Sequence, residues 1–342
     1  MLIHNPYDVE TTPGGPGSAP SGATRFVGVD VGGTNIKSVV LSQATGTPEV
    51  IEKAECATTG TTPVEILQQV AEIARGHLDR SATPATLGFS LPGAVDRRTG
   101  VTGVMPNLPG VWHGVPAVDI VSGITGVQTS IVNDARAFAL AESRLGAARG
   151  LRVVVGVTLG TGLGGGIVVN GSLLEGTSGF AGELGHQIVS LGGARCGCGN
   201  RGCAETFVKT QALVTATGLP SAQAVFRSAA QGELAAVSAV GTYIAHLAVA
   251  LANVHTLLCP DAFVIGGGIA EAEAQLFHPL LDKMKALIMF DHPTSVHLRK
   301  AMLGPWAGAI GAALVASDAT AALSISSAGR WTRAGVDSVE WA

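Results

Sequence analysis

One histidine and three cysteines stand close together in the middle of the chain. His186 is followed ten residues later by Cys196, and Cys198 and Cys203 come within the next seven residues. Imidazole nitrogen and thiolate sulfur are donors that zinc prefers, and four of them complete a tetrahedral shell with no position open to a substrate. We therefore predict a structural zinc ion on these four side chains. The alternative is three buried or reactive thiols beside an unrelated histidine.

A glycine turn near the start of the chain has the composition of an anion site. Residues 30–37 read Asp-Val-Gly-Gly-Thr-Asn-Ile-Lys and lie between two strand-like runs. Glycines let backbone N–H groups point at a phosphate, threonine adds a hydroxyl donor, and aspartate oxygen suits Mg²⁺. A plain tight hairpin is the alternative. The residues predicted to contact ATP or its Mg²⁺ here are Asp30, Gly32, Gly33, Thr34, Asn35 and Lys37.

Two later glycine clusters extend this pattern. Residues 158–166 hold five glycines and two threonines, and three glycines at 266–268 directly follow an apolar run. Neither cluster is a Walker A or a Rossmann sequence. Together the three clusters favour an actin-like ATPase arrangement, in which a nucleotide lies in the cleft between two similar domains. The nucleotide contacts predicted from the later clusters are Thr158, Gly160, Thr161, Gly162, Gly164, Gly266, Gly267 and Gly268.

The elements that carry these loops alternate between strands and helices. Helical periodicity covers 64–78 and 135–145, and the remaining runs have strand composition. A strand–glycine turn–strand unit occurs twice, which indicates an internal duplication of architecture. The fold class predicted is α/β, a two-domain actin-like ATPase (ribonuclease H-like) fold with mixed sheets. The strand-like runs are 25–30, 36–41, 86–89, 130–132, 153–158, 166–169 and 262–265.

The domain boundaries follow from composition and from the position of the loops. Residues 1–24 read as a flexible leader rich in proline, glycine, serine and threonine. Residues 25–134 form the expected N-terminal domain, which contains the first glycine turn. Residues 135–317 form the expected C-terminal domain, which contains the predicted zinc loop and the two later glycine clusters. The sequence gives no prediction of the structure of the tail, residues 318–342.

Composition excludes several classes of protein. The 342 residues are 46% hydrophobic with a formal net charge of −4, which argues against a general binder of nucleic acids or membrane surfaces. The first twenty residues lack the pattern of a secretory signal, so a cytoplasmic protein is expected. The uncharged stretch 234–260 has the length of a membrane span, but polar residues recur at helical spacing within it. We therefore expect a buried helix there.

The whole set of motifs resembles the ROK family of sugar kinases, repressors and open reading frames. The resemblance runs from about residue 26 to 315. It is carried by the Asp-x-Gly-Gly-Thr turn, the Asn133-Asp134 pair, the second glycine loop, Glu183-x-x-His186, and Cys-x-Cys-x4-Cys-x-Glu ending at Glu205. In such a kinase, phosphoryl transfer needs mainly positioning, charge neutralisation and a nearby proton acceptor.

The resemblance implies roles for single residues. Asp134 is expected to be the general base, and one nitrogen of His186 binds zinc while the other meets the sugar. Without the resemblance, Asn133-Asp134 reads as a helix N-cap, and Glu183 and Glu205 as solvated carboxylates. The full set of expected sugar contacts is Gly93, Asn107, Asn133, Asp134, Glu183, His186 and Glu205.

Three departures from the family pattern stand out. Lys209 occupies a position where a small residue is usual, and we expect it near one edge of the sugar. Ser90 replaces a usual glycine, and residues 305–308 replace a more polar turn. We expect neither of these two to touch the chemistry.

The function implied is ATP-dependent phosphorylation of a hexose, with glucose the expected substrate and a homodimer the expected assembly. A kinase for an N-acetylhexosamine such as N-acetylmannosamine is the alternative within the same class. A sugar-responsive ROK repressor without its DNA-binding domain is the alternative from another class. Its helix-turn-helix domain would precede the kinase-like body, and the few basic residues before the first strand do not fit one. Polyphosphate stays open as a second phosphoryl donor.

Overall fold

The computed structural model describes residues 23–78, 85–289 and 296–328, with side chains as far as 321. Its N-terminal sheet has the order β3-β2-β1-β4-β7. The strands β1, β2 and β3 are antiparallel neighbours, while β4 and β7 continue the sheet in parallel with β1. The prediction of a mixed sheet is confirmed. The strands are β1 (Thr24–Val31), β2 (Asn35–Gln43), β3 (Glu49–Ala57), β4 (Ala85–Leu91) and β7 (Thr129–Asn133).

The C-terminal sheet repeats this topology strand for strand. Its order is β10-β9-β8-β11-β12, with β8, β9 and β10 antiparallel and with β11 and β12 parallel to β8. The glycine turn between β1 and β2 thus corresponds to the glycine loop between β8 and β9. The duplication predicted from the sequence is confirmed. The strands are β8 (Val153–Leu159), β9 (Leu163–Val169), β10 (Ser172–Leu173), β11 (Ala262–Gly266) and β12 (Leu298–Lys300).

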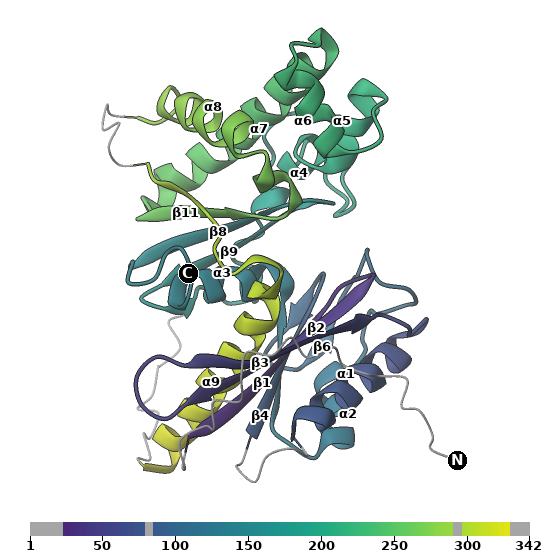
Figure 1. Cartoon of the computed structure of the whole chain (residues 1–342), viewed down its shortest axis with the longest axis vertical. Helices are drawn as coiled ribbons and strands as arrows, with labels where there is room; N and C mark the ends of the chain where they lie inside the picture. The colour runs from purple at the N-terminus through teal and green to yellow at the C-terminus, as the bar shows by residue number, and fades with distance from the viewer. Residues whose placement is uncertain (1–22, 79–84, 290–295, 329–342) are drawn as a thin grey trace, which may run out of the picture.

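Helices form layers outside and between the two sheets (Figure 1). The outer face of the N-terminal sheet packs against α1 (Pro63–Leu78) and α2 (Ala117–Thr125). Between the sheets lie α3 (Asp134–Arg144) and α9 (Ala307–Ala328), whose small side chains join one core with residues of both sheets. The outer face of the C-terminal sheet is covered by α4 (Ala204–Phe207), α5 (Thr210–Thr217), α6 (Ala222–Ala230), α7 (Leu234–Leu258) and α8 (Glu273–Lys285).

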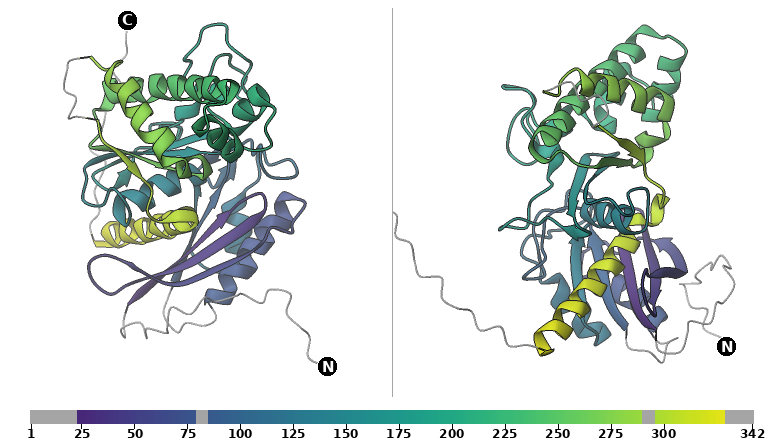
Figure 2. Two further views of the ribbon diagram at one scale, coloured as in Figure 1. Left: turned by 45° about the horizontal axis from the view of Figure 1, so that its top comes forward. Right: turned by 90° about the vertical axis from the view of Figure 1, so that its left-hand side faces the viewer.

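Helix α9 returns to the N-terminal sheet, although the sequence-based division placed residues up to 317 in the second domain. It packs on β1 and β4 and crosses the molecule between the sheets, as both views of Figure 2 show. The approach is close enough to require glycine, because a Cβ on Gly28 would lie 2.0 Å from the carbonyl oxygen of Ala309. A Cβ on Gly88 would lie 1.9 Å from that of Ala312. Some of the many glycines therefore serve packing rather than ligand binding. The helix also continues into the tail, for which the sequence predicted no structure.

Helix α7 accounts for the uncharged stretch 234–260. Within the described residues it is the helix long and apolar enough to cross a membrane, and 44% of its most apolar window is buried inside the protein. Leu247 and Leu251 lie in the core, whereas Thr242, Asn253 and Thr256 face solvent. Its packing against α5, α6 and α8 is that of the buried helix expected from the polar residues.

Candidate active site and metal centre

The junction of β7 and α3 places Asp134 at the bottom of a cleft. Asn133 ends the strand and caps the helix, because its Oδ1 accepts a hydrogen bond from the backbone N–H of Arg136 at 3.1 Å. Its Nδ2 donates to Oδ1 of Asp134 at 2.9 Å and to the carbonyl oxygen of Gly93 at 3.0 Å. Asn133 and Asp134 can therefore form a helix N-cap and also belong to the candidate site, since the capping residue Asn133 orients the carboxylate of Asp134.

Asp134 has the electrostatics of a general base. Its pKa is raised from 3.8 to about 7. Burial is the largest cause and the neighbouring carboxylates of Asp30 and Glu183 also raise the pKa, whereas hydrogen bonds from the backbone of Ala135 and from Asn133 lower it. A carboxylate with a pKa near neutrality is both ionised in large part and basic enough to accept a proton at pH 7. The strong perturbation inside a cleft marks Asp134 as a candidate catalytic residue.

Asp30 lies near the end of β1 and is partly buried. Burial raises its pKa above the ordinary value, while the hydrogen bond from Ser90 and the charge of Lys37 lower it. The hydroxyl of Ser90 donates to Oδ1 of Asp30 at 2.6 Å. On the other side, a Cβ on Gly308 would lie 2.4 Å from Oδ2. The expectation that Ser90 and the turn 305–308 lie away from the chemistry is therefore wrong, because both contact this carboxylate.

A pocket of about 340 Å³ opens above Asp134. It brings together all seven residues predicted to contact a sugar and the predicted residues of the second glycine loop. The loop between β8 and β9 thus forms one wall, and the segments that carry Glu183, His186 and Glu205 form another. The pocket is lined by Pro92, Gly93, Pro106, Asn107, Asn133, Asp134, Ala135, the residues from Thr158 to Gly165, Glu183, His186, Glu205, Gly267 and Gly268.

A second pocket of about 400 Å³ shares Asp134 with the first. It contains the predicted nucleotide residues Asp30, Thr158 and the three glycines 266–268, of which the first ends β11. Sequence reasoning missed the rest of its lining, because Phe138, Glu271 and Lys300 belong to no glycine motif. Lys300 pairs with Glu271 at 3.0 Å, Nζ to Oε2. The remaining lining residues are Ala135, Ile265, Ala270, Ala301, Gly304, Pro305, Ala307 and Gly308.

The structure does not bring the rest of the first glycine turn into either pocket. Gly32, Gly33, Thr34, Asn35 and Lys37 are absent from both linings. Asn35 donates from Nδ2 to Oε1 of Glu55 at 2.7 Å, and Nζ of Lys37 lies 3.2 Å from the same oxygen. Of the predicted residues in this turn, Asp30 is the one that reaches the nucleotide pocket.

Lys209 lies beside the second glycine loop and does not line the sugar pocket. The next residue, Thr210, donates to the carbonyl oxygen of Gly160 from its backbone nitrogen and from its hydroxyl, both at 2.9 Å. The position of Lys209 at an edge of the sugar therefore stays a prediction, and the residue flanks the loop predicted to hold phosphates.

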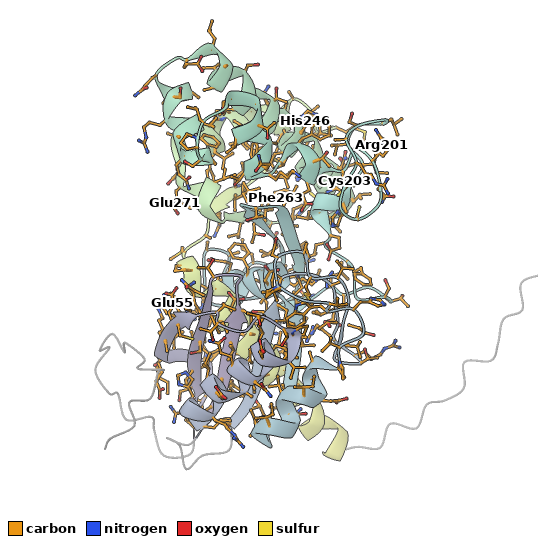
Figure 3. All side chains as sticks on the ribbon, turned by 90° about the vertical axis from the view of Figure 1, so that its right-hand side faces the viewer. Glu55, Arg201, Cys203, His246, Phe263 and Glu271 are labelled. Carbon is orange, nitrogen blue, oxygen red and sulfur yellow. The ribbon has the colours of Figure 1, made fainter. Side chains whose placement is uncertain are left out.

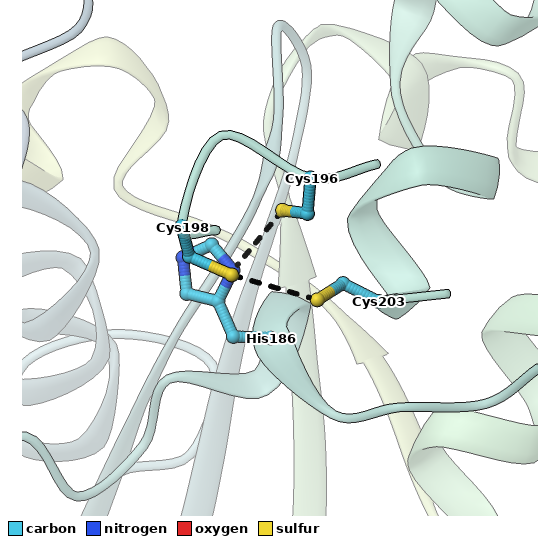
Figure 4. A group of neighbouring side chains, drawn as sticks. All are labelled: His186, Cys196, Cys198 and Cys203. Atoms are coloured by element: carbon cyan, nitrogen blue, oxygen red, sulfur yellow. Dashed lines mark hydrogen bonds between the residues drawn. The ribbon is translucent and has the colours of Figure 1, made fainter. Parts of the chain in front are cut away.

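The four predicted metal ligands meet in one cluster (Figure 4). Their ligand atoms lie within 4.8 Å of one another. Nδ1 of His186 is 3.6 Å from Sγ of Cys196, and the sulfurs of Cys198 and Cys203 are 3.6 Å apart. In a tetrahedral site with Zn–S bonds of about 2.3 Å, sulfurs are about 3.8 Å apart, so the cluster has the size of a zinc shell.

The candidate metal cluster borders the pocket of about 340 Å³, because His186 belongs to both. Because Nδ1 of His186 faces Cys196, its Nε2 is the nitrogen left for the pocket, 3.9 Å from Oε2 of Glu183. Glu205 follows Cys203 by two residues and accepts a 3.4 Å hydrogen bond from the backbone of Leu163 in the glycine loop. Figure 3 shows Cys203 and Glu271 on opposite sides of Phe263 in β11.

Comparison with known proteins fits this geometry. Residues 26–319 match the sequence profile of the ROK family. The chain belongs to the ROK family. It is 33% identical to a glucokinase of Thermotoga maritima over 313 residues, which are 85% of this chain and 96% of the relative.

Solved structures of ROK proteins are similar over the same range. The ROK hexokinase from Thermus thermophilus has a TM-score of 0.77 at 32% identity, covering 87% of this chain and 99% of that one. A ROK glucokinase from Streptomyces griseus, solved in complex with glucose and AMPPNP, has a TM-score of 0.72 at 28% identity and covers 86% of this chain and 99% of that one. The ROK resemblance and the fold class expected from the sequence are confirmed.

Proposed function

We propose that this ROK protein transfers the γ-phosphoryl group of ATP to a hexose, and that glucose is its substrate, giving glucose 6-phosphate. The observation that carries the proposal is the position of Asp134, which lines both the sugar pocket and the nucleotide pocket and has a pKa of about 7. The similarity to glucokinases, one of them solved with glucose and an ATP analogue, supports the choice of substrates.

Asp134 accepts the proton of the attacking sugar hydroxyl in this proposal. The hydroxyl becomes a better nucleophile as its proton leaves, and the sugar oxygen bonds to the γ-phosphorus while the bond to the β-phosphate oxygen breaks. Asn133 holds the carboxylate in position through the 2.9 Å bond from its Nδ2.

The remaining sugar hydroxyls find partners in the walls of the same pocket. Glu183, His186, Glu205 and Asn107 offer acceptors and donors for them, and Gly93 lines the same pocket. Such a ring of polar groups fits a polyol, because each buried hydroxyl requires a partner.

The nucleotide side is the pocket that Asp30, Thr158 and the glycines 266–268 line. The glycine loop from Thr158 to Gly164 supplies backbone N–H groups near the transferred phosphate. Asp30 is the carboxylate that would hold Mg²⁺, which neutralises phosphate charge when bound with ATP. The one lysine that lines this pocket, Lys300, is paired with Glu271.

We further propose that the cluster of His186, Cys196, Cys198 and Cys203 holds a structural zinc ion. Its donor types and its compactness support a closed site. Its effect on the reaction is indirect, because the ion fixes the segment from Glu183 to Glu205 and thereby the direction of Nε2 of His186.

The experiment for the catalytic proposal replaces Asp134 by Ala and follows ADP release from ATP and Mg²⁺ with a panel of hexoses and N-acetylhexosamines. We expect the unaltered protein to be most active on glucose and Asp134→Ala to lose at least about a hundredfold in turnover. Near-unaltered turnover in Asp134→Ala would contradict its role as base. If the protein prefers an N-acetylhexosamine, the proposed substrate changes, but the role of Asp134 as general base does not.

A further inference from the structure

Arg136 is a charged side chain enclosed next to the sugar pocket. It lies in the first turn of α3, two residues after Asp134, and only 2% of its surface is exposed. Burial of a guanidinium is unfavourable unless acceptors satisfy its donors. The partners of Arg136 therefore indicate what the side chain does.

Those partners lie on the loop that leads into the sugar site. Nη2 of Arg136 donates to Oε1 of Glu183 at 2.9 Å, and Nε donates to the carbonyl oxygen of Ala181 at 3.3 Å. The backbone nitrogen of Arg136 donates to Oδ1 of Asn133. One residue thus joins the start of α3 to the loop 181–183, which is distant in sequence.

The bond to Arg136 also determines which part of Glu183 is available to a ligand. Oε1 is occupied by the guanidinium, while Oε2 lies 3.9 Å from Nε2 of His186 in the wall of the pocket. The Glu183 side chain is 39% exposed, so a ligand can reach it. Without Arg136 this carboxylate would be free to rotate toward solvent.

We propose that Arg136 is a positioning residue for the acceptor sugar. It holds Glu183 turned toward the pocket, and it fixes the loop 181–183 to the same helix end that carries Asp134. The sugar and the base then keep their relative position. This inference rests on the proposed function, because it assigns a role within the same site.

The shape of arginine matters for this role. The planar guanidinium presents several donors at fixed angles, so it bonds a carboxylate and a backbone carbonyl at once. Lysine carries the same charge but presents a single ammonium group, which reaches one of the two acceptors well. A variant with lysine at position 136 should therefore keep part of the sugar affinity.

The experiment compares Arg136→Met and Arg136→Lys with the unaltered protein, measuring KM for ATP, KM for the best hexose, kcat, and sugar binding by calorimetry. We expect Arg136→Met to raise KM and Kd for the sugar about 10- to 100-fold, with KM for ATP within about twofold of the original. For Arg136→Lys, KM and Kd for the sugar should lie between those of Arg136→Met and those of the unaltered protein.

Two controls separate positioning from general stability. Arg144→Met removes a comparable arginine at the other end of α3, where both Nη atoms bond Asp318 at 2.7 and 2.9 Å, and it should leave KM for the sugar unchanged. The double variant Arg136→Met with Glu183→Gln should bind sugar no worse than Glu183→Gln alone, because both changes remove one contact.

An Arg136→Met protein with the original KM for the sugar would overturn the inference. So would a double variant in which the losses of sugar affinity of the two single variants multiply. If Arg136→Met does not fold, Arg136→Lys alone and combined with Glu183→Gln supplies the same comparison. An unaltered protein that phosphorylates no hexose would instead contradict the proposed function. Calorimetry with the sugar distinguishes the two failures, because it reports binding without turnover.

Discussion

The hydroxyl of Ser90 donates a 2.6 Å hydrogen bond to Oδ1 of Asp30, at the point where the parallel strands β1 and β4 end side by side. The two residues are register partners in the sheet, so the bond follows from backbone pairing. It lowers the pKa of a carboxyl that burial raises. A residue that departs from the usual glycine of the family thus contacts the carboxylate proposed to hold Mg²⁺.

Replacing Ser90 by Ala should weaken both the fold and the nucleotide site. The buried oxygen of Asp30 loses its partner, which costs about 1–3 kcal/mol in the free energy of unfolding. The pKa of Asp30 should rise further, so the carboxyl binds Mg²⁺ less well and KM for Mg·ATP increases. Urea unfolding and steady-state kinetics measure the two effects. Ser122→Ala, which removes a 3.3 Å bond to the carbonyl oxygen of Asp119, is the control and should change neither quantity.

The activity should depend on pH through Asp134. The base accepts a proton only when ionised, so kcat/KM for the hexose should rise with pH and level off above the pKa of about 7. Below that value it should fall about tenfold per pH unit. A pH series at subsaturating hexose measures the profile. A rate that is flat from pH 5 to 8 would contradict the assignment.

Replacing Asp134 by Asn should stabilise the protein at alkaline pH while removing activity. The pKa of Asp134 is raised in the folded state, so between pH 3.8 and about 7 the unfolded chain has released a proton that the folded chain keeps. Stability therefore falls as pH rises through this interval, and the ionised carboxylate destabilises the fold above it.

Asparagine keeps the acceptor oxygen for Asn133 and Ala135 without the charge. The expected gain in the free energy of unfolding at pH 8 is up to about 4 kcal/mol, and it should vanish near pH 3. Thermal unfolding at the two pH values measures it. The exposed Asp119→Asn should show no such gain, and a loss of stability in Asp134→Asn at pH 8 would show that the carboxylate is not strained there.

Replacing Cys198 by Ser should remove the metal and weaken sugar binding. We expect about one zinc per chain by elemental analysis of the unaltered protein and less in the variant. KM for the hexose should increase more than KM for ATP, because the cluster borders the sugar pocket and not the nucleotide pocket. Cys259→Ser, at an exposed cysteine outside the cluster, is the matched control. A zinc-free protein with normal sugar affinity would contradict the proposal.

Local patterns in the sequence determined much of this protein. Glycine turns between strand-like runs predicted the two hairpins β1–β2 and β8–β9, since turn chemistry is local. The spacing of His186 and the three cysteines predicted their cluster, because a short glycine-rich loop leaves few other arrangements. The Asn133-Asp134 pair marked the strand–helix junction for the same reason.

Tertiary structure decided what depends on contacts between distant segments. Ser90 reaches Asp30, and Arg136 reaches Glu183, only because strands and a helix far apart in sequence are packed together. Helix α9 returns to the N-terminal sheet across glycines whose spacing shows no local signal. Lys300 and Glu271 border the nucleotide pocket without any motif. Sequence alone thus specified the loops that carry the chemistry, whereas the packing of distant elements set the pKa of Asp134, the direction of Glu183 and the shape of the cleft.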